Sequence, residues 1–113
     1  MSRYAPFDVV VVPFPYSDVL GEKRRPAVVV SGGALEDQAG VLWLAMITST
    51  TRPLALGDAP VADLTAAGLK VPCRVRAAKL ATLDLNRVLR RSGRLAPADA
   101  AAVRSALQAC AGF

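Results

Sequence analysis

Two short polar segments of this chain carry the residue types that chemistry at a phosphate requires. Lys23–Pro26 places three consecutive cations directly before the apolar run Ala27–Ser31, and its proline fixes the backbone where a strand is expected to begin. A guanidinium held at the mouth of a rigid strand can donate to two phosphate oxygens at once. The alternative is a solvated basic turn between two strands.

The second segment is the hydroxyl cluster Thr48–Thr51, which ends the nearly continuous apolar run Val41–Thr48. We expect this run to be a doubly covered central strand next to Ala27–Ser31. If the two strands are antiparallel, the start of one lies beside the end of the other, so Arg25 and Thr48 would converge on one phosphate. Taken alone, such hydroxyls more often cap strand ends than bind ligands.

The complete lack of histidine narrows the possible chemistry. None occurs among the 113 residues, which excludes a Ser-His-Asp triad, a paired-histidine ribonuclease mechanism and most zinc sites. The two cysteines, Cys73 and Cys110, have no metal-ligand spacing. The sequence therefore predicts no metal and no cofactor, and any catalysis must use arginine, lysine, hydroxyl, carboxylate or thiol groups.

The positive charge is segregated along the chain. The net charge is +5, and the stretch Lys70–Arg94 holds eight cations against a single acid, Asp84. Between Ser31 and Leu69 the balance is acidic. This segregation indicates a polyanionic partner, either nucleic acid or a strongly acidic protein.

The elements that must position these residues are mostly short strands. Further strands are predicted over 8–13, 71–79 and 89–95 and a short one over 60–63, with helical turns over 34–38 and 83–88. The alternation of cations with apolar residues over 71–79 predicts a strand with one exposed basic face. Pro97 opens a terminal helix that ends near Gly112. Without βαβ alternation, the sequence predicts one domain over 1–113, mainly β with a C-terminal helix, in a small, partly closed barrel.

The sequence predicts neither a transmembrane segment nor a signal peptide. No segment approaches the roughly 18 apolar residues that span a bilayer, and the first residues lack the apolar run of a signal peptide. The sequence thus predicts a cytoplasmic protein without membrane association, in which Cys73 and Cys110 are reduced and mainly pack.

Four segments, in order along the chain, resemble the MazF/PemK family of toxins from toxin–antitoxin systems. They are Asp8–Asp18 with its Pro-Phe-Pro loop, Lys23–Ser31, Ile47–Ser49 and Val75–Asp84. Their combination is specific, although the Arg-Pro strand entry alone would be weak. The resemblance covers nearly the whole chain, from about Phe7 to the terminal helix. Cys73 departs from it, because similar sequences often carry serine there.

The resemblance implies an SH3-like (CcdB/PemK-like) barrel, a homodimer, and a cognate antitoxin whose acidic, flexible tail blocks the RNA groove. It also implies a sequence-specific, metal-independent endoribonuclease acting on single-stranded RNA, with Arg25 and Thr48 as the catalytic pair. With neither metal nor histidine, the available nucleophile is the 2′-hydroxyl of the RNA. Its attack on the adjacent phosphorus would leave a 2′,3′-cyclic phosphate and a 5′-hydroxyl.

Single-stranded RNA is expected to lie over the loop Phe14–Gly21 and the basic strand. The expected RNA-binding residues are Tyr16, Ser17, Arg24, Ser49, Arg74 and Arg76. Tyr16 can either stack on a base or anchor its loop. Lys79 and the run Arg87–Arg94 are expected to face solvent or the antitoxin.

Two other functions fit the same barrel. The first is a toxin that poisons DNA gyrase through its terminal helix, a branch that usually has a tryptophan near the chain end; this chain ends in Gln108–Phe113, without one. The second is a nucleic-acid binder that has lost catalysis.

Overall fold

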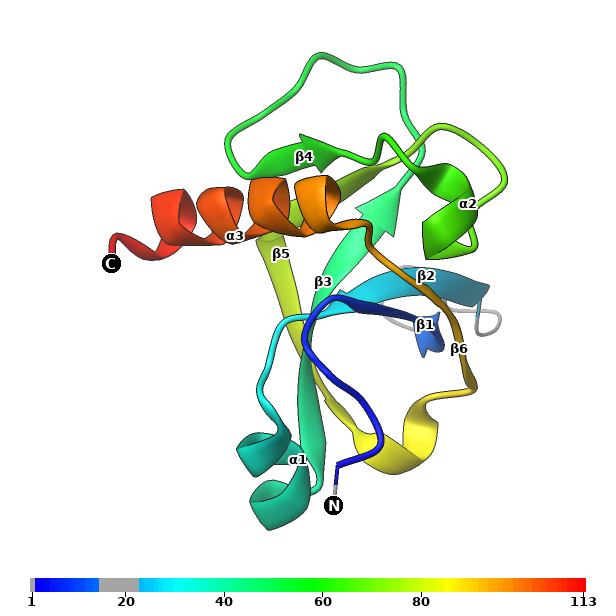
Figure 1. The fold of residues 1–113 in the computed structure, drawn as a ribbon, viewed down its shortest axis with the longest axis vertical. Helices are drawn as coiled ribbons and strands as arrows, with labels where there is room; N and C mark the ends of the chain where they lie inside the picture. Colours follow the sequence, from blue (N-terminus) through cyan, green and yellow to red (C-terminus); the bar gives the residue numbers. More distant parts are fainter. Residues whose placement is uncertain (1, 15–22) are drawn as a thin grey trace.

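The computed structural model describes residues 2–14 and 23–113 (Figure 1). Along the described chain the elements are β1 (Asp8–Phe14), β2 (Lys23–Val29), α1 (Gly33–Ala39), β3 (Val41–Thr48), β4 (Asp58–Pro60), α2 (Leu64–Ala67), β5 (Arg74–Asp84), the 3-10 turn η2 (Leu85–Arg87), β6 (Arg90–Arg94) and α3 (Pro97–Ala111). The strands form one antiparallel sheet in the order β4-β5-β3-β2-β1-β6. The predicted class, mainly β with a C-terminal helix, is confirmed.

The sheet is strongly bent, and α3 lies against β4 and β5 at one end of it (Figure 1). Its outermost strands, β4 and β6, are not paired with each other among the described residues. The barrel is therefore open, in keeping with the partial closure expected from the sequence. Within the same residues, no helix has the length and apolar character needed to cross a bilayer.

Both faces of the central strands are covered, which explains their nearly continuous apolar sequences. Val9 and Val28 belong to one buried cluster, to which Val103 of α3 also belongs. Val10 and Ala27, their chain neighbours, point into a second cluster on the opposite face. β3 runs over Val41–Thr48 as predicted, although Trp43 on it is half exposed.

β2 begins earlier than predicted, at Lys23, so its cations lie within the strand. Val11 of β1 pairs with Pro26, whereas the pairing of β2 with β3 begins only at Ala27, opposite Met46. Because proline has no backbone N–H, it cannot take part in hydrogen-bond ladders with a neighbouring strand on each side. The strand can therefore contain Pro26 because β3 has already separated from it at this point.

Two other boundaries differ from the sequence predictions. The short strand lies at 58–60 rather than 60–63, because Asp63 begins α2 by accepting a hydrogen bond from the Ala66 N–H. β5 extends to Asp84 instead of ending at residue 79. Its register against β3 shifts between Ala45 and Met46, and this bulge lets one long strand pair along all of β3.

Candidate functional site

A cleft of about 820 Å³ opens where β2 begins and β3 ends. β2 and the end of β3 contribute Arg24, Arg25, Pro26, Ile47, Thr48 and Ser49 to its lining. The segment after α2 and the β6 region contribute Gly68, Leu69, Lys70, Val71, Cys73, Leu89, Arg90 and Ser92, and Val11 of β1 completes the described lining. The cleft therefore joins segments that lie far apart in the sequence.

Arg25 and Thr48 both line this cleft. Arg25 lies two residues before Ala27, and Thr48 lies two residues after Met46, the partner of Ala27 on β3, so both residues lie at the same edge of the sheet. Both residues are half-buried, and both line the cleft. The convergence expected from antiparallel pairing is thus present, and the catalytic role of the pair stays a prediction.

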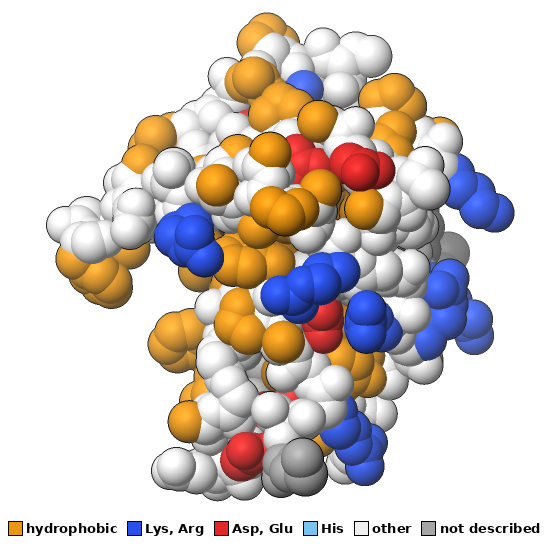
Figure 2. Space-filling model, viewed as in Figure 1, with side chains coloured by type: hydrophobic (Ala, Val, Ile, Leu, Met, Phe, Trp, Pro, Cys, Tyr) orange, Lys and Arg blue, Asp and Glu red, His pale blue; other side chains and the backbone are white. Residues whose placement is uncertain are grey.

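The charge of the cleft has one sign. Its cations are Arg24, Arg25, Lys70 and Arg90, and none of its described lining residues is acidic. Figure 2 shows lysine and arginine side chains gathered along the right-hand side of the view, where Figure 1 places β2, β6 and α2. A concave surface with this charge attracts anions.

Cys73 lines the same cleft. Its Sγ–H donates to the Val71 carbonyl oxygen over 2.8 Å, and burial raises the pKa of the Cys73 thiol above its ordinary value. A raised pKa removes the thiolate form, which is the nucleophile. Cys73 therefore packs and donates a hydrogen bond, as the sequence suggested.

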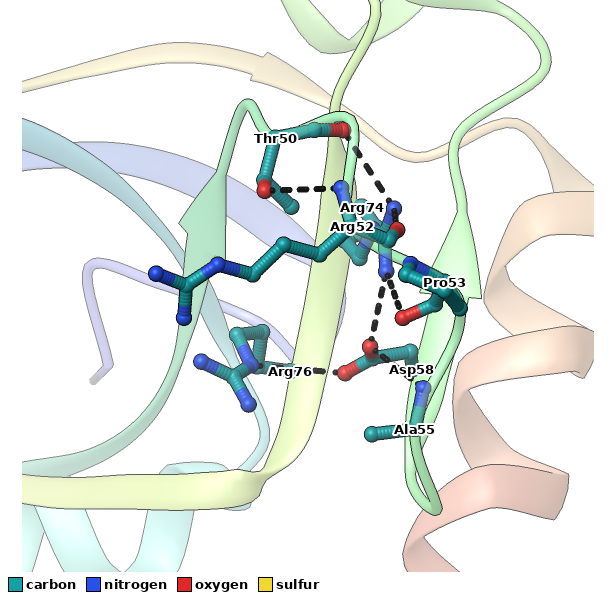
Figure 3. A network of polar contacts seen from close by, with 7 residues as sticks. All are labelled: Thr50, Arg52, Pro53, Ala55, Asp58, Arg74 and Arg76. Carbon is teal, nitrogen blue, oxygen red and sulfur yellow. Dashed lines mark hydrogen bonds and ion pairs between the residues drawn. The ribbon is translucent and has the colours of Figure 1, made fainter.

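A second, smaller cleft of about 460 Å³ adjoins the first, because Thr48 and Ser49 line both. Arg74 of β5 organises its wall (Figure 3). The Arg74 guanidinium donates to the carbonyl oxygens of Thr50, Arg52 and Pro53, at 3.3, 2.6 and 3.1 Å. One side chain thus fixes the backbone that directly follows Thr48 and Ser49.

Asp58 completes this network. Its Oδ2 accepts from the Ala55 N–H at 2.9 Å and from Arg74 at 3.0 Å, and its Oδ1 lies 3.4 Å from Nε of Arg76. Burial alone would raise the pKa of Asp58, but the Ala55 N–H and the guanidinium groups of Arg74 and Arg76 outweigh it. The pKa of Asp58 is held below its ordinary value of 3.8.

Comparison with known proteins assigns the family. The model of the family described as PemK-like, MazF-like toxin of type II toxin–antitoxin system matches residues 5–110. This chain belongs to that family. A comparison with curated proteins found no match.

Several solved structures share the fold of this MazF-like toxin. An endoribonuclease in complex with its cognate antitoxin, from mycobacterial species, has a TM-score of 0.78 at 18% identity, over 97% of this chain and 96% of that one. Toxin MazF-mt6 of Mycobacterium tuberculosis has a TM-score of 0.76 at 20% identity, over 94% and 97%. MazF of Deinococcus radiodurans has a TM-score of 0.75 at 23% identity, over 97% of each chain.

The other RNA-binding residues predicted for this toxin divide into three groups. Arg24 and Ser49 line the first cleft. Arg76, with a side chain 33% exposed, lines the second together with Arg74. Tyr16 and Ser17 lie outside the described residues.

The predicted exposed basic face of the strand 71–79 is wrong for Arg74. The Arg74 side chain is only 11% exposed, because its guanidinium turns toward the loop and Asp58. The alternation of cations and apolar residues showed that Arg74 leaves the core face, but a carboxylate on the neighbouring strand covers it. Contact of Arg74 with RNA stays a prediction.

Two cleft cations of this toxin were missed in the sequence. Arg90 belongs to the run Arg87–Arg94, which was expected to face solvent or the antitoxin, yet it lines the cleft. Lys70 had no assigned role. Their placement depends on which strand pairs with β1 and where α2 docks, and neither is encoded in local sequence. The only local signal was the excess of cations after Leu69.

Proposed function

We propose that this toxin is an endoribonuclease that cleaves single-stranded RNA in the cleft at the start of β2 and the end of β3, without a metal ion. The observation that carries the proposal is that Arg25 and Thr48, from neighbouring strands, line one cleft whose described charged residues are all basic. A polyanion is the ligand that such a cleft favours. Divalent cations prefer carboxylate and carbonyl oxygens, and the cationic lining repels them.

The proposed step is an in-line transfer within the RNA. The 2′-oxygen forms a bond to the adjacent phosphorus, and the bond from phosphorus to the 5′-oxygen breaks. The 2′-oxygen loses its proton and the departing 5′-oxygen gains one, which leaves a 2′,3′-cyclic phosphate and a 5′-hydroxyl. No water is consumed, so the site needs to hold only the RNA itself.

Arg25 and Thr48 act on the charge that builds up during this step. Negative charge gathers on the non-bridging phosphate oxygens, where the Arg25 guanidinium stabilises it and the Thr48 hydroxyl donates a further hydrogen bond. The guanidinium has only N–H donors and no acceptor, so Arg25 is no general base. Arg25 therefore serves as the charge stabiliser, with proton donation to the 5′-oxygen as its second available role.

We further propose a homodimer and a cognate antitoxin for this chain. Family membership supports both, and one similar structure is an endoribonuclease in complex with its cognate antitoxin. An acidic, flexible antitoxin segment would complement the cationic cleft and exclude RNA from it. Inhibition then requires no change in the fold of the toxin.

The proposed activity is tested by incubating the purified toxin with a long transcript in excess EDTA and mapping every new end. We expect cleavage at a recurring short sequence, with 5′-hydroxyl ends and 3′ ends that resist phosphatase until acid opens the cyclic phosphate. RNA that stays intact, or cleavage only after a divalent cation is restored, would overturn the proposal. Ends with a 3′-hydroxyl would exclude attack by the 2′-oxygen.

A further inference from the structure

We propose that Lys70 and Arg90 form a second phosphate site in the cleft, which holds the RNA one or more nucleotides away from the cleaved bond. This inference rests on the proposed ribonuclease function. It adds that the toxin needs a strand with at least one phosphate beyond the scissile one. Both residues are distinct from the proposed catalytic pair, Arg25 and Thr48. They lie on the part of the cleft that is built by β6 and the segment after α2.

The backbone that carries Lys70 is held firmly against β6. Gly68 ends α2 in the left-handed conformation, with φ of 72°, and a Cβ there would overlap the Ser92 carbonyl oxygen. Only glycine permits this approach. On the facing strand, a Cβ on Gly93 would lie 2.5 Å from the Ala66 carbonyl oxygen. Lys70, two residues beyond Gly68, is therefore presented from a fixed turn.

Arg90 is fixed from the other side. It pairs with Val11 of β1, and Val11 pairs in turn with Pro26 of β2. The Leu89 N–H also donates to the Val11 carbonyl oxygen at 2.9 Å. Two strand spacings, about 10 Å in all, thus separate the backbones of Arg90 and Pro26. That separation lets Arg90 and Arg25 bind different phosphates of one strand.

Lys70 and Arg90 differ from the structural cations of the fold in having no acidic partner within the part of the chain that the structure describes. Arg74 and Arg76 pair with Asp58, and Arg91 and Arg94 pair with Asp8. No ion pair to Lys70 or Arg90 occurs within residues 2–14 and 23–113. Cations left unneutralised in one concave site repel each other, and a bound anion relieves that repulsion.

The cleft favours RNA over an acidic peptide because apolar surface lies between its cations. Val11 and Leu89 line it, and Val11 lies on β1 between Pro26 of β2 and Arg90 of β6. A single-stranded RNA alternates charged phosphates with flat bases, and it binds best where basic and apolar surfaces alternate likewise. Carboxylates on a peptide would match the cations but leave this apolar surface uncovered.

The test measures binding apart from cleavage. A fluorescent oligonucleotide that covers the mapped cleavage site, with every 2′-hydroxyl methylated so that it cannot be cut, is titrated with wild type, Lys70→Ala, Arg90→Ala and the double variant. Arg3→Ala is the matched control: it removes the same charge from an exposed residue, whose backbone N–H bonds to Glu36 of α1, away from the cleft. Thermal unfolding verifies that each variant is folded.

We expect Lys70→Ala and Arg90→Ala each to weaken binding about tenfold. Because each variant would make one cation–phosphate contact fewer, the slope of log K against log salt should become shallower by about 0.7. With cleavable RNA, KM should rise by the same factor while kcat stays near wild type. If Lys70→Ala and Arg90→Ala have the same RNA affinity and the same salt slope as Arg3→Ala, the proposal is wrong.

Two further outcomes separate this inference from its alternatives. If the wild type cuts no RNA but these variants still bind it less tightly, the ribonuclease proposal fails and the phosphate site survives as a binding site. If RNA affinity is unchanged while affinity for polyglutamate falls, the residues serve an acidic protein and the inference is wrong.

Discussion

Two sets of arginine side chains in this toxin differ in whether a carboxylate neutralises them. The paired set holds the fold together and consists of Arg74, Arg76, Arg91 and Arg94. The set that lines the cleft has no acid among its described lining and consists of Arg24, Arg25 and Arg90. Residue type alone does not separate the two sets, because the distinction depends on where Asp8 and Asp58 lie.

Two substitutions separate the contribution of the Thr48 hydroxyl to cleavage from that of the side-chain shape. Thr48→Val keeps the branched shape but removes the donor, and we expect it to lower the cleavage rate by about 10²-fold. Thr48→Ser keeps the hydroxyl and should stay within about tenfold of wild type. Single-turnover cleavage of one oligonucleotide measures both, and a Thr48→Val variant as active as wild type would remove Thr48 from the site.

Among the elements, the loop between β3 and β4 is held by a single cation and a single acid. Arg74 bonds to three of its carbonyl oxygens, and Asp58 bonds to Arg74 and to the Ala55 N–H. The loop begins immediately after Thr48 and Ser49, so these bonds also fix the end of β3. Arg74 and Asp58 thereby position one wall shared by the two clefts.

The lowered pKa of Asp58 gives this network a defined pH dependence. Its ionised form contributes stability above the ordinary pKa of 3.8, and that contribution is lost as the pH falls through the lower pKa of the folded protein. Asp58→Asn should lower the free energy of unfolding by about 1–3 kcal/mol at neutral pH. The difference from wild type should shrink below pH 3.8.

Urea unfolding of both proteins between pH 7 and pH 3 measures this difference. Asp84→Asn is the control, because it removes the same charge at an exposed strand end. A difference between wild type and Asp58→Asn that is independent of pH would show that the carboxylate charge of Asp58 does not hold the loop.

The elements themselves could largely be predicted from the sequence, because apolar runs and prolines are local signals. The strands at 8–14 and 41–48 and the helix from Pro97 follow the predicted bounds closely. The bulge in β5 and the placement of β4 follow instead from pairing between distant segments. The convergence of Arg25 and Thr48 could be predicted from the sequence, because it depends on a single antiparallel strand pairing. The positions of Lys70 and Arg90 could not, because they also depend on where α2 and β6 lie.

On the scale of the whole molecule, the net charge of +5 is less informative than its concentration in one cleft. Four described cations line that cleft, so RNA binding should release counterions and weaken as salt rises. If each cation contacts one phosphate, log K should fall against log salt with a slope of about −3. Anisotropy titrations from low to high salt measure the slope, and a slope near zero would show that the cleft does not bind the RNA backbone.

The central claim is that Arg25 stabilises the phosphate during cleavage in this cleft. The most direct test is the single-turnover rate of RNA cleavage in EDTA for wild type, Arg25→Ala and the control Arg3→Ala, with the thermal unfolding of each measured in parallel. Arg25→Ala should cut at least about 10²–10³-fold more slowly, with a Tm within a few degrees of wild type, while Arg3→Ala keeps the wild-type rate. An Arg25→Ala variant that is folded and cuts RNA as fast as wild type would contradict the claim.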